Sequence, residues 1–517
     1  MATPAVLQFM NAADEIVGKG RLLAGDDAPA LIEAERTLTY KQLDLLVNRY
    51  GNAMLAAGIS AEDRVLFMLD DSSDFIAAYL AAIRIGAVAV AFNLRASSND
   101  LRHVIDETRA PLLLIEADLL DVFAGIENRL EHKPKVFVNQ PREQNTPSLV
   151  DFLNDHCDQL KSIQLSPDDM ACWVYSSGTT GAPKAVVHLH HDVLEAERHL
   201  TENLSIKPRD RLFCSSKLFF AYALGNILFG GLRAGATLIL NRGWPDADRV
   251  VDVIERYQPD YFFTVPTFYR SLLTEGIAER PAFHRLRGCI SAGENLPSCL
   301  LENWHEVTGQ PIYEGIGTSE TLFLVIANHP HAWKPGCTGR PQPWVGAKLL
   351  DDDQQTINDV DGVGMLWIKS SSVADRYWNR QQLSRSTFVG DWYATGDMFS
   401  FDNDGWWRHH GRADSMLKIS GQWVSPVEIE ERACTAEGVA DVAVVGKTNE
   451  HGLVRATMFV VPKNQPCNEG QFRDHLMNHL QAGLAIYKCP RDIRLVEKLP
   501  RTITGKVQRY VLRDWIR

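Results

Sequence analysis

Several features that define other classes of protein are missing from this sequence. Its 517 residues contain no hydrophobic run long enough to span a bilayer. The longest, residues 218–232, includes Asn226 and several glycines, so we expect a buried segment there. Residues 1–20 have no basic start followed by an apolar core, and we expect no secretory signal peptide. These absences predict a cytoplasmic protein without a membrane span.

Cysteine pairs and an excess of positive charge are also missing. The nine cysteines are scattered, with no C-x-x-C spacing, which fits a reducing cytosol and buried thiols. The formal net charge is −12. This argues against a nucleic-acid partner, because neutralising phosphates needs clustered Lys and Arg. A small phosphorylated ligand needs only a local basic groove and stays compatible with this charge.

The material for a large folded core is present. Hydrophobic residues make up 45% of the chain, which includes 12 Trp, and its length predicts two or more compact units. Hydrophobic periodicity alternates between strand-like and helix-like segments, which predicts an α/β fold with largely parallel sheets. The segments that carry this pattern are strands at 63–70, 88–93, 236–240 and 261–266, and helices at 40–57, 72–87 and 249–257.

The pattern changes past about residue 340. Short strand-like runs separated by Gly-Asp and Asp-Gly turns predict a β-rich subdomain. The last hundred residues return to mixed α and β, with a helix predicted at 426–436, a strand at 439–447 and a helix at 471–484. We place the domain boundary so that residues 1–413 form a large N-terminal domain and residues 414–517 a small C-terminal one.

One segment carries a recognisable chemical pattern. Residues 175–188, YSSGTTGAPKAVVH, follow an apolar strand and are rich in Gly, Ser and Thr. Successive backbone N–H groups in such a loop can hold a phosphate, with hydroxyls and Lys184 as further donors. The segment is not a Walker A loop, because Gly181 is followed by Ala-Pro-Lys. The residues alone leave a phosphate loop and an ordinary surface loop both open.

SSGTTGAPKAVV resembles the phosphate loop of the acyl-adenylate-forming, AMP-binding superfamily, which includes acyl-CoA synthetases, peptide-synthetase adenylation domains and luciferases. The resemblance covers essentially the whole chain. It implies a large N-terminal domain of two αβ-layered subdomains plus a β-rich subdomain, followed by a small mobile α+β domain. Further motifs of the superfamily follow in order: SAGENLP (291–297), GIGTSET (315–321), YATGD (393–397), GRADSMLKISGQWVSPVEIEE (411–431) and LPRTITGKVQR (499–509).

The resemblance implies ATP, Mg²⁺ and coenzyme A as cofactors, a carboxylic acid as substrate, and catalytic roles for Lys184 and Glu320. A hard carboxylate such as Glu320 suits Mg²⁺, and Asp397 would accept hydrogen bonds from the ribose hydroxyls. Arg412 would also contact the nucleotide. Without the resemblance, these three would be interpreted as capping, turn and surface residues. The other predicted nucleotide-binding residues are Ser176, Ser177, Gly178, Thr179, Thr180, Gly181, Ala292, Gly293, Glu294, Glu314, Gly315, Ile316, Gly317, Thr318 and Ser319.

The resemblance also assigns roles to the C-terminal segment. Lys506 would bridge the carboxylate oxygen of the acid and the α-phosphate of ATP, although composition alone would favour a solvated basic tail. Asp414 would be the hinge about which the small domain turns between the two half-reactions. Gly421 would line the coenzyme A channel, where close approach of the backbone leaves no room for a side chain.

Within the superfamily the chain is most similar to benzoate–CoA ligases and related aryl-CoA synthetases. Ala221 and Tyr222 would then form the wall of the acyl pocket, which suits a flat ring. Phe323 would also belong to this pocket. Three residues depart from those relatives: Phe323 stands where they have a pocket His, and Ala223 and Ala185 replace glycines. We therefore expect a more apolar pocket, for a substituted aromatic or a medium-chain acid. The supporting stretches are NAAD (11–14), VHLHHD (187–192), KLFFAYALGN (217–226) and VPTFY (265–269).

Other interpretations remain at this point. The histidines at 188, 190, 191, 409 and 410 have no Cys or carboxylate companions at ligand spacing, so packing or surface roles are predicted for them. An enzyme that loads a carrier protein, a non-catalytic nucleotide-binding module and a luciferase-like oxygenase share some of the motifs. Retention of Lys506, Glu320 and Asp397 argues against the non-catalytic module. The oligomeric state is open, with a homodimer as one assembly.

Overall fold

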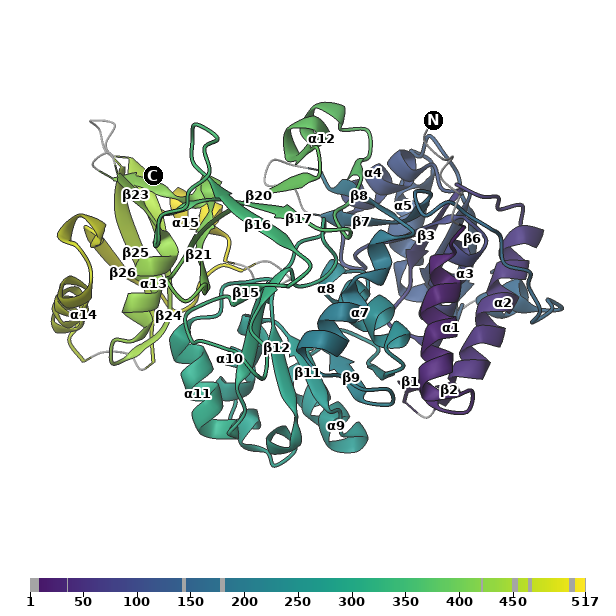
Figure 1. Ribbon diagram of the computed structural model, residues 1–517, viewed down its shortest axis with the longest axis horizontal. Helices are drawn as coiled ribbons and strands as arrows, with labels where there is room; N and C mark the ends of the chain where they lie inside the picture. The colour runs from purple at the N-terminus through teal and green to yellow at the C-terminus, as the bar shows by residue number, and fades with distance from the viewer. Residues whose placement is uncertain are drawn as a thin grey trace, which may run out of the picture.

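The computed structural model (Figure 1) describes residues 9–34, 36–141, 146–176, 182–419, 422–448, 454–463, 467–501 and 507–516. Two large sheets and their helices form the N-terminal part of the molecule. A β-rich subdomain follows, and a small C-terminal unit lies at the opposite end of the molecule from the first helices (Figure 1). This is the fold class that the sequence predicts.

The first large sheet has seven strands in the order β18-β8-β7-β4-β3-β5-β6. The strands from β7 to β6 in this order run parallel, whereas β8 pairs antiparallel with β7 and β18 antiparallel with β8. The bounds are β3 Arg64–Met68, β4 Val88–Ala91, β5 Leu112–Glu116, β6 Lys135–Asn139, β7 Met170–Ser176, β8 Lys184–Leu189 and β18 Arg376–Tyr377.

The second large sheet has nine strands in the order β15-β14-β13-β12-β11-β9-β10-β1-β2. The six strands from β13 to β1 in this order run parallel, with antiparallel strands at both edges. The bounds are β1 Pro29–Glu33, β2 Arg36–Thr39, β9 Arg211–Cys214, β10 Thr237–Leu240, β11 Tyr261–Thr264, β12 Gly288–Ser291, β13 Ile312–Ile316, β14 Ile326–Ala327 and β15 Arg340–Pro341.

Helices fill the space between these sheets and cover their outer faces. The hydrophobic cluster between the sheets includes residues of α1 Ala12–Ala24, α2 Tyr40–Ala56, α3 Ser73–Arg84, α8 Ala221–Ala223 and the π-helix Leu224–Gly231. The outer face of the first sheet packs against α4 Ser98–Thr108 and α5 Leu120–Glu127. The outer face of the second packs against α9 Ala247–Tyr257, α10 Pro266–Thr274 and α11 Ser298–Thr308. The short helices are α6 Leu149–Leu153 and α7 Ala196–Arg198.

Two smaller units follow in the chain. The β-rich subdomain has the strand order β16-β17-β20-β19, with β21 on β20 and α12 Gln381–Thr387 beside it. Its strands are β16 Gly346–Leu350, β17 Gly364–Lys369, β19 Phe388–Val389, β20 Trp392–Phe401 and β21 Trp407–Arg412. The C-terminal unit contains β22 Leu417–Ile419, β23 Gln422–Val424, α13 Pro426–Cys434, β24 Val439–Thr448, β25 Val454–Pro462, α14 Glu469–Gly483, β26 Asp492–Leu495 and α15 Arg509–Asp514.

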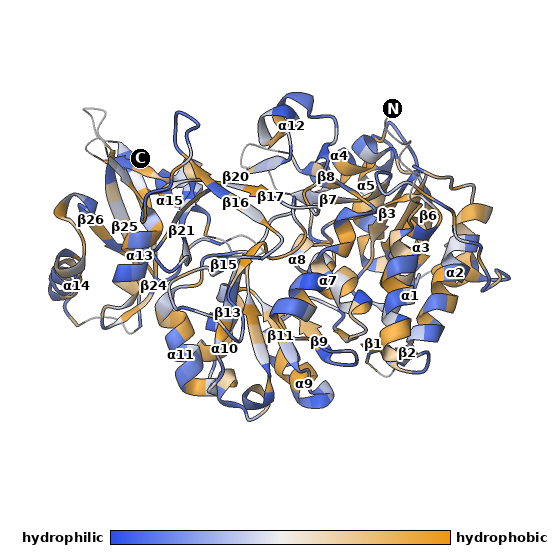
Figure 2. Ribbon diagram, in the orientation of Figure 1, coloured by the Kyte–Doolittle hydropathy of each residue, from blue (hydrophilic) through white to orange (hydrophobic). Residues whose placement is uncertain are grey.

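Local sequence explains why these elements begin where they do. Thr39 and Gln42 form a capping box that starts α2, and the Ser72 hydroxyl accepts the Phe75 N–H at the start of α3. The helices and strands predicted from periodicity are all present, with ends that shift by a few residues. Figure 2 shows hydrophobic residues concentrated on the inner strands and hydrophilic ones on the outer faces of the helices. The domain boundary at 413–414 stays a prediction.

Candidate active site

The predicted phosphate loop joins β7 to β8, which form an antiparallel hairpin. Ser176 at the end of β7 is paired in register with Lys184 at the start of β8. Ser177, Gly178, Thr179, Thr180 and Gly181 lie outside the described residues. The hairpin therefore places Lys184 directly at the base of the predicted loop, where a cation would be useful for binding phosphate.

Glu320 lies in a buried setting opposite Lys184. The residue is 6% exposed. The hydroxyl of Tyr377 donates to Oε1 at 2.7 Å, and that of Tyr393 donates to Oε2 at 3.1 Å. Lys184 Nζ is 3.7 Å from Oε1 and lies 4.1 Å from the ring centre of Tyr377. Donors on both oxygens fix the orientation of this carboxylate, and burial raises the pKa of both tyrosines, so their hydroxyls keep their protons.

The backbone before Glu320 is held by its neighbours. The Thr318 hydroxyl accepts the N–H of Glu320 at 3.2 Å. The carbonyl of Ser319 lies 2.8 Å from His188 Nε2, and that imidazole is fully buried. A Cβ on Gly317 would collide with the carbonyl oxygen of Phe323, so a side chain at 317 would displace the loop. These contacts keep the segment from Ile316 to Glu320 in one conformation.

Two side chains of β21, those of His409 and Arg412, contact Asp397 in β20. It is 5% exposed. Its Oδ1 lies 3.0 Å from His409 Nε2, and Arg412 Nη1 donates to Oδ2 at 3.2 Å. Arg412 also donates to the carbonyl of Thr395 at 2.7 Å. Gly396 has φ +76°, and a Cβ there would lie 2.7 Å from the Arg412 guanidinium, so the Thr-Gly-Asp sequence is needed for this close approach.

The predicted adenine-side loop follows β12. Ala292 is buried, and Gly293 adopts φ +86°. The hydroxyl of Thr267 donates to Glu294 Oε2 at 2.6 Å. Arg501 from the C-terminal unit donates to the Thr267 hydroxyl at 3.2 Å. The C-terminal unit therefore contacts Thr267, which holds Glu294 of the adenine-side loop, through a residue that precedes the predicted catalytic lysine by five positions.

One buried and one partly buried carboxyl group, Glu314 and Glu431, interact electrostatically between the N-terminal and C-terminal units. Glu314 on β13 is 7% exposed and accepts the Leu296 N–H at 3.3 Å; Gly315 follows it on the same strand. Burial, together with the charge of Glu431 on α13, raises the pKa of Glu314 to about 8 against the lowering effect of the Leu296 N–H. Burial also raises the pKa of Glu431 to about 7, opposed by a hydrogen bond with Asn295. Glu314 is therefore mostly protonated at neutral pH.

This protonation predicts a pH-dependent stability. The unfolded Glu314 ionises above pH 4.5, whereas the folded one keeps its proton until about pH 8, so its contribution to stability is lost as pH rises between these values. Glu314→Gln should raise the apparent melting temperature by on the order of a few degrees at pH 8.5 and little at pH 5. Melting curves of this variant and of Glu306→Gln, an exposed residue of α11, test this. A difference that does not change with pH would contradict it.

The predicted acyl residues lie at the start of α8. The hydroxyl of Tyr222 donates to the Ile290 carbonyl at 3.1 Å, and its ring centre is 6.3 Å from that of Phe263. Ala221 and Tyr222 pack against the cluster between the two large sheets. Phe323 is 1% exposed and belongs to the cluster of the β-rich subdomain. Its assignment to the acyl pocket stays a prediction.

The remaining predicted residues are in the C-terminal segment. Asp414 is exposed between β21 and β22, where its Oδ1 accepts the Ser415 hydroxyl at 3.2 Å. Gly421 and Lys506 lie outside the described residues. Arg501 and Val507, which flank the segment that contains Lys506, pair with each other in an antiparallel bridge. The hinge, channel and catalytic assignments stay predictions.

Several residues of this site carry no signal in the sequence that assigns them to it. Tyr377 carries no motif and is found only from its contact with Glu320. His409 was interpreted as a packing or surface residue, whereas it contacts Asp397. Thr267 lies in VPTFY (265–269) and Arg501 in LPRTITGKVQR (499–509), but nothing in the sequence indicates that the two residues are in contact. Each of these contacts joins segments that are distant in the chain or lie on neighbouring strands.

The part of the chain that the structure describes also bears on metal binding and membrane insertion. Within those ranges, no group of three or more His, Cys, Asp and Glu side chains could hold a metal ion. In the same ranges, no helix combines the length and the apolar character needed to cross a membrane.

Comparison with known proteins gives matches along nearly the whole chain. The family model described as AMP-binding enzyme matches residues 23–378, and the AMP-binding enzyme C-terminal domain matches residues 428–506. The 3-hydroxybenzoate–CoA ligase of Aromatoleum sp. (strain CIB) is 45% identical over 98% of this chain and 97% of its own length. The 3-hydroxybenzoate–CoA/4-hydroxybenzoate–CoA ligase of Thauera aromatica is 46% identical over 98% of both chains.

A solved structure is similar over the full length as well. The anthranilate CoA ligase AuaEII in complex with anthranoyl-AMP is 32% identical, with a TM-score of 0.92 over 100% of this chain and 99% of that chain. Fold and site together define an adenylate-forming enzyme. The chain belongs to the AMP-binding enzyme family, which confirms the superfamily predicted from the motifs.

Proposed function

We propose that this chain, an AMP-forming aryl–CoA ligase, activates 3-hydroxybenzoate with ATP and Mg²⁺ and transfers the acyl group to coenzyme A. The observation that carries the choice of acid is the 45% and 46% identity, over 98% of the chain, to two ligases named for 3-hydroxybenzoate. The first half-reaction forms an acyl-adenylate and pyrophosphate. The second forms the thioester and releases AMP.

The first half-reaction needs negative charge to be neutralised. A carboxylate oxygen of the acid attacks the α-phosphorus of ATP, and pyrophosphate leaves; like charges repel during this approach. Lys184, at the base of the phosphate loop, and Lys506 would offset that charge. Asp397, held by His409 and Arg412, would accept hydrogen bonds from the ribose hydroxyls.

Glu320 fits a role as a magnesium ligand. It offers hard carboxylate oxygens, its orientation is fixed by Tyr377 and Tyr393, and it lies beside the cation that would bind phosphate. When bound, Mg²⁺ supplies positive charge to the phosphates of ATP. The protein would contribute a preoriented carboxylate and the exclusion of water from around it.

The second half-reaction uses the thiol of coenzyme A. The sulfur attacks the acyl carbon of the adenylate, the thiol proton is lost, and AMP leaves with the electrons of the acyl–oxygen bond. Turning of residues 414–517 about Asp414 would replace Lys506 by the loop around Gly421. An enzyme that loads a carrier protein remains the alternative, and the identity of the thioester separates the two.

The cellular setting is part of the same proposal. Scattered free cysteines fit a reducing cytoplasm, and we place the enzyme there. A homodimer is the assembly to test by light scattering.

A panel of acids tests the proposed substrate. We expect kcat/KM for acid-dependent AMP release with coenzyme A to be at least about 10-fold higher for 3-hydroxybenzoate than for benzoate, because a site built to bind a hydroxyl rejects an analogue that lacks it. The panel should include 4-hydroxybenzoate, anthranilate and C4–C10 fatty acids. Preference for benzoate or for a fatty acid would overturn the assignment of the acid and leave the ligase chemistry in place.

A further inference from the structure

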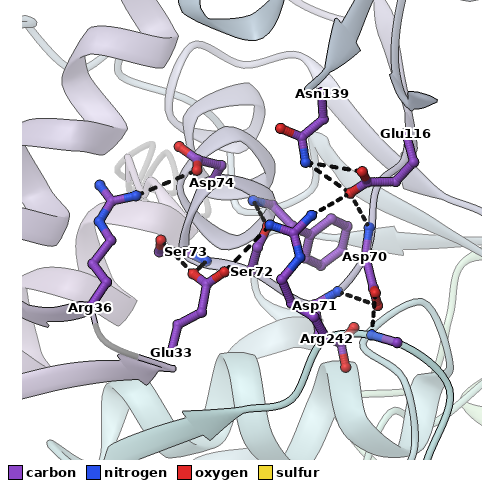
Figure 3. Close-up of polar contacts among 12 residues, drawn as sticks. Glu33, Arg36, Asp70, Asp71, Ser72, Ser73, Asp74, Glu116, Asn139 and Arg242 are labelled. Carbon is purple, nitrogen blue, oxygen red and sulfur yellow. Dashed lines mark hydrogen bonds and ion pairs between the residues drawn. The ribbon is translucent and has the colours of Figure 1, made fainter. Parts of the chain in front are cut away.

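A group of carboxylates gathers where strands of both large sheets end. Glu33 is the last residue of β1, Asp70 and Asp71 lie just after β3, and Glu116 is the last residue of β5 (Figure 3). Arg242, after β10, donates to Glu116 at 3.1 Å and lies 3.6 Å from Glu33. This network therefore crosses from the first sheet to the second. Of these residues, Asp71 is buried and the others are partly buried, which strengthens their electrostatic interactions relative to those of fully exposed pairs.

Lys217 is the buried cation of this network. Only 3% of this residue is exposed. Its Nζ donates to Asp70 Oδ1 at 2.7 Å and to the carbonyl of Asn241 at 2.8 Å, and it lies 3.6 Å from Asp71 Oδ2. Asp70 also accepts the N–H of Gly243. The two aspartates of the first sheet thus hold the loops that follow β9 and β10 of the second.

The side chain of Asp71 binds a backbone N–H of the loop that follows β9. The N–H of Leu218 donates to Asp71 Oδ1 at 3.0 Å. Burial raises the pKa of Asp71 to about 6, and the charge of Lys217 opposes that rise. The carboxyl is therefore charged at neutral pH, where it attracts Lys217 most strongly.

The loop held in this way leads directly into the acyl residues. Phe220 N–H donates to the Lys217 carbonyl at 2.9 Å, and α8 begins at Ala221. The far end of Tyr222 is fixed by its hydrogen bond to Ile290. The ring of Tyr222 thus has two anchors: its hydroxyl on β12, and its backbone through Lys217 and the aspartates.

We propose that Lys217 is a positioning residue for the acid substrate: with Asp70 and Asp71 it fixes the backbone from β9 to Tyr222. The proposal rests on the proposed function, because it assigns the acyl pocket to Ala221 and Tyr222. In the described residues, Lys217 contacts neither the nucleotide motifs nor Glu320. Replacing it should therefore change KM for the acid and not KM for ATP.

Arg84 offers a matched control. It is 4% exposed, at the other end of α3, and pairs with Asp14 at 2.9 Å and Asp44 at 2.8 Å. Like Lys217, it is a buried cation with two carboxylate partners. Among the described residues, its ion pairs and side-chain hydrogen bonds involve Asp14, Asp44 and Asn48 and not α8, so Arg84→Met measures the effect on stability of losing such a cation.

The test compares Lys217→Met, Arg84→Met and Asp71→Asn as full-length enzymes. Wild-type turnover is first established with an acid from the panel, and that acid is used throughout. We expect Lys217→Met to raise KM for the acid about 10-fold or more while KM for ATP changes less than about 2-fold. Arg84→Met should lower the melting temperature and leave both KM values within that limit. Asp71→Asn, which keeps an acceptor for Leu218, should act as Lys217→Met does but less strongly.

Two further readouts separate positioning from loss of stability. The ratio of kcat/KM between 3-hydroxybenzoate and bulkier ring-substituted acids should shift by several-fold in Lys217→Met and stay constant in Arg84→Met. Equal changes in KM for acid and ATP, or an unchanged KM for acid in both Lys217→Met and Asp71→Asn, would overturn the proposal. If Lys217→Met does not fold, Asp71→Asn alone decides between these results. Absence of wild-type turnover with every acid would instead overturn the proposed function.

Discussion

Replacing Lys506 by methionine should slow acyl-adenylate formation by about 10²–10³-fold, because one preorganised donor to the developing charge is lost. The structure supports this indirectly. Arg501, five positions earlier, contacts Thr267, which holds Glu294 of the adenine-side loop. Arg501 also pairs with Asp441 at 2.6 Å. The C-terminal unit is thus docked on the nucleotide side of the site.

The measurement separates the two half-reactions. Acid-dependent exchange of pyrophosphate into ATP should fall in Lys506→Met, whereas thioester formation from synthetic acyl-adenylate and coenzyme A should change little. Lys498→Met, at an exposed position of the same terminal segment, is the matched control and should leave both rates unchanged. Equal losses in the two half-reactions would show that Lys506 acts on folding or docking and not on adenylation.

Replacing Glu320 by glutamine should lower the adenylation rate by about 10²-fold and raise the Mg²⁺ concentration needed for half-maximal rate. Glutamine keeps the size of the side chain and an oxygen that can accept from Tyr377 or Tyr393. It removes the negative charge that faces Lys184 at 3.7 Å and would face the metal. The substitution should therefore change the adenylation rate more than it changes the free energy of unfolding.

Glu107 on α4 provides a control with the same local chemistry. It accepts the Tyr175 hydroxyl at 2.9 Å and lies 3.3 Å from Arg380. It therefore combines a tyrosine donor and a cation, as Glu320 does. Magnesium titrations of Glu320→Gln and Glu107→Gln should differ, with a shifted midpoint in the first only. The same midpoint in both variants and the wild type would contradict the assignment of Glu320 as a metal ligand.

Much of the fold is predictable because its signals are local. The capping residues and the apolar spacing of α2 and α3 lie within single segments, and so do the alternating strands of the C-terminal unit. The site motifs are also short and contiguous, so their presence and order can be recognised directly. These features explain why the fold class and the family can be predicted from the sequence.

The sequence does not show which distant segments contact each other. β1 lies beside β10, about 200 residues later, and Lys217 meets Asp70 across 147 positions. Nothing near Tyr377 indicates that its hydroxyl reaches Glu320. Phe323 is a further case: its position in a motif predicts a pocket residue, and the sequence does not show that its side chain packs in the hydrophobic cluster of the β-rich subdomain.

The most direct test of the central claim is one reaction containing the full chain, ATP, Mg²⁺, coenzyme A and 3-hydroxybenzoate, with products identified by mass. We expect 3-hydroxybenzoyl-CoA, AMP and pyrophosphate in equal amounts, and none of them when the acid is omitted. ADP and phosphate as products, or an acyl-adenylate that never yields the thioester, would contradict it.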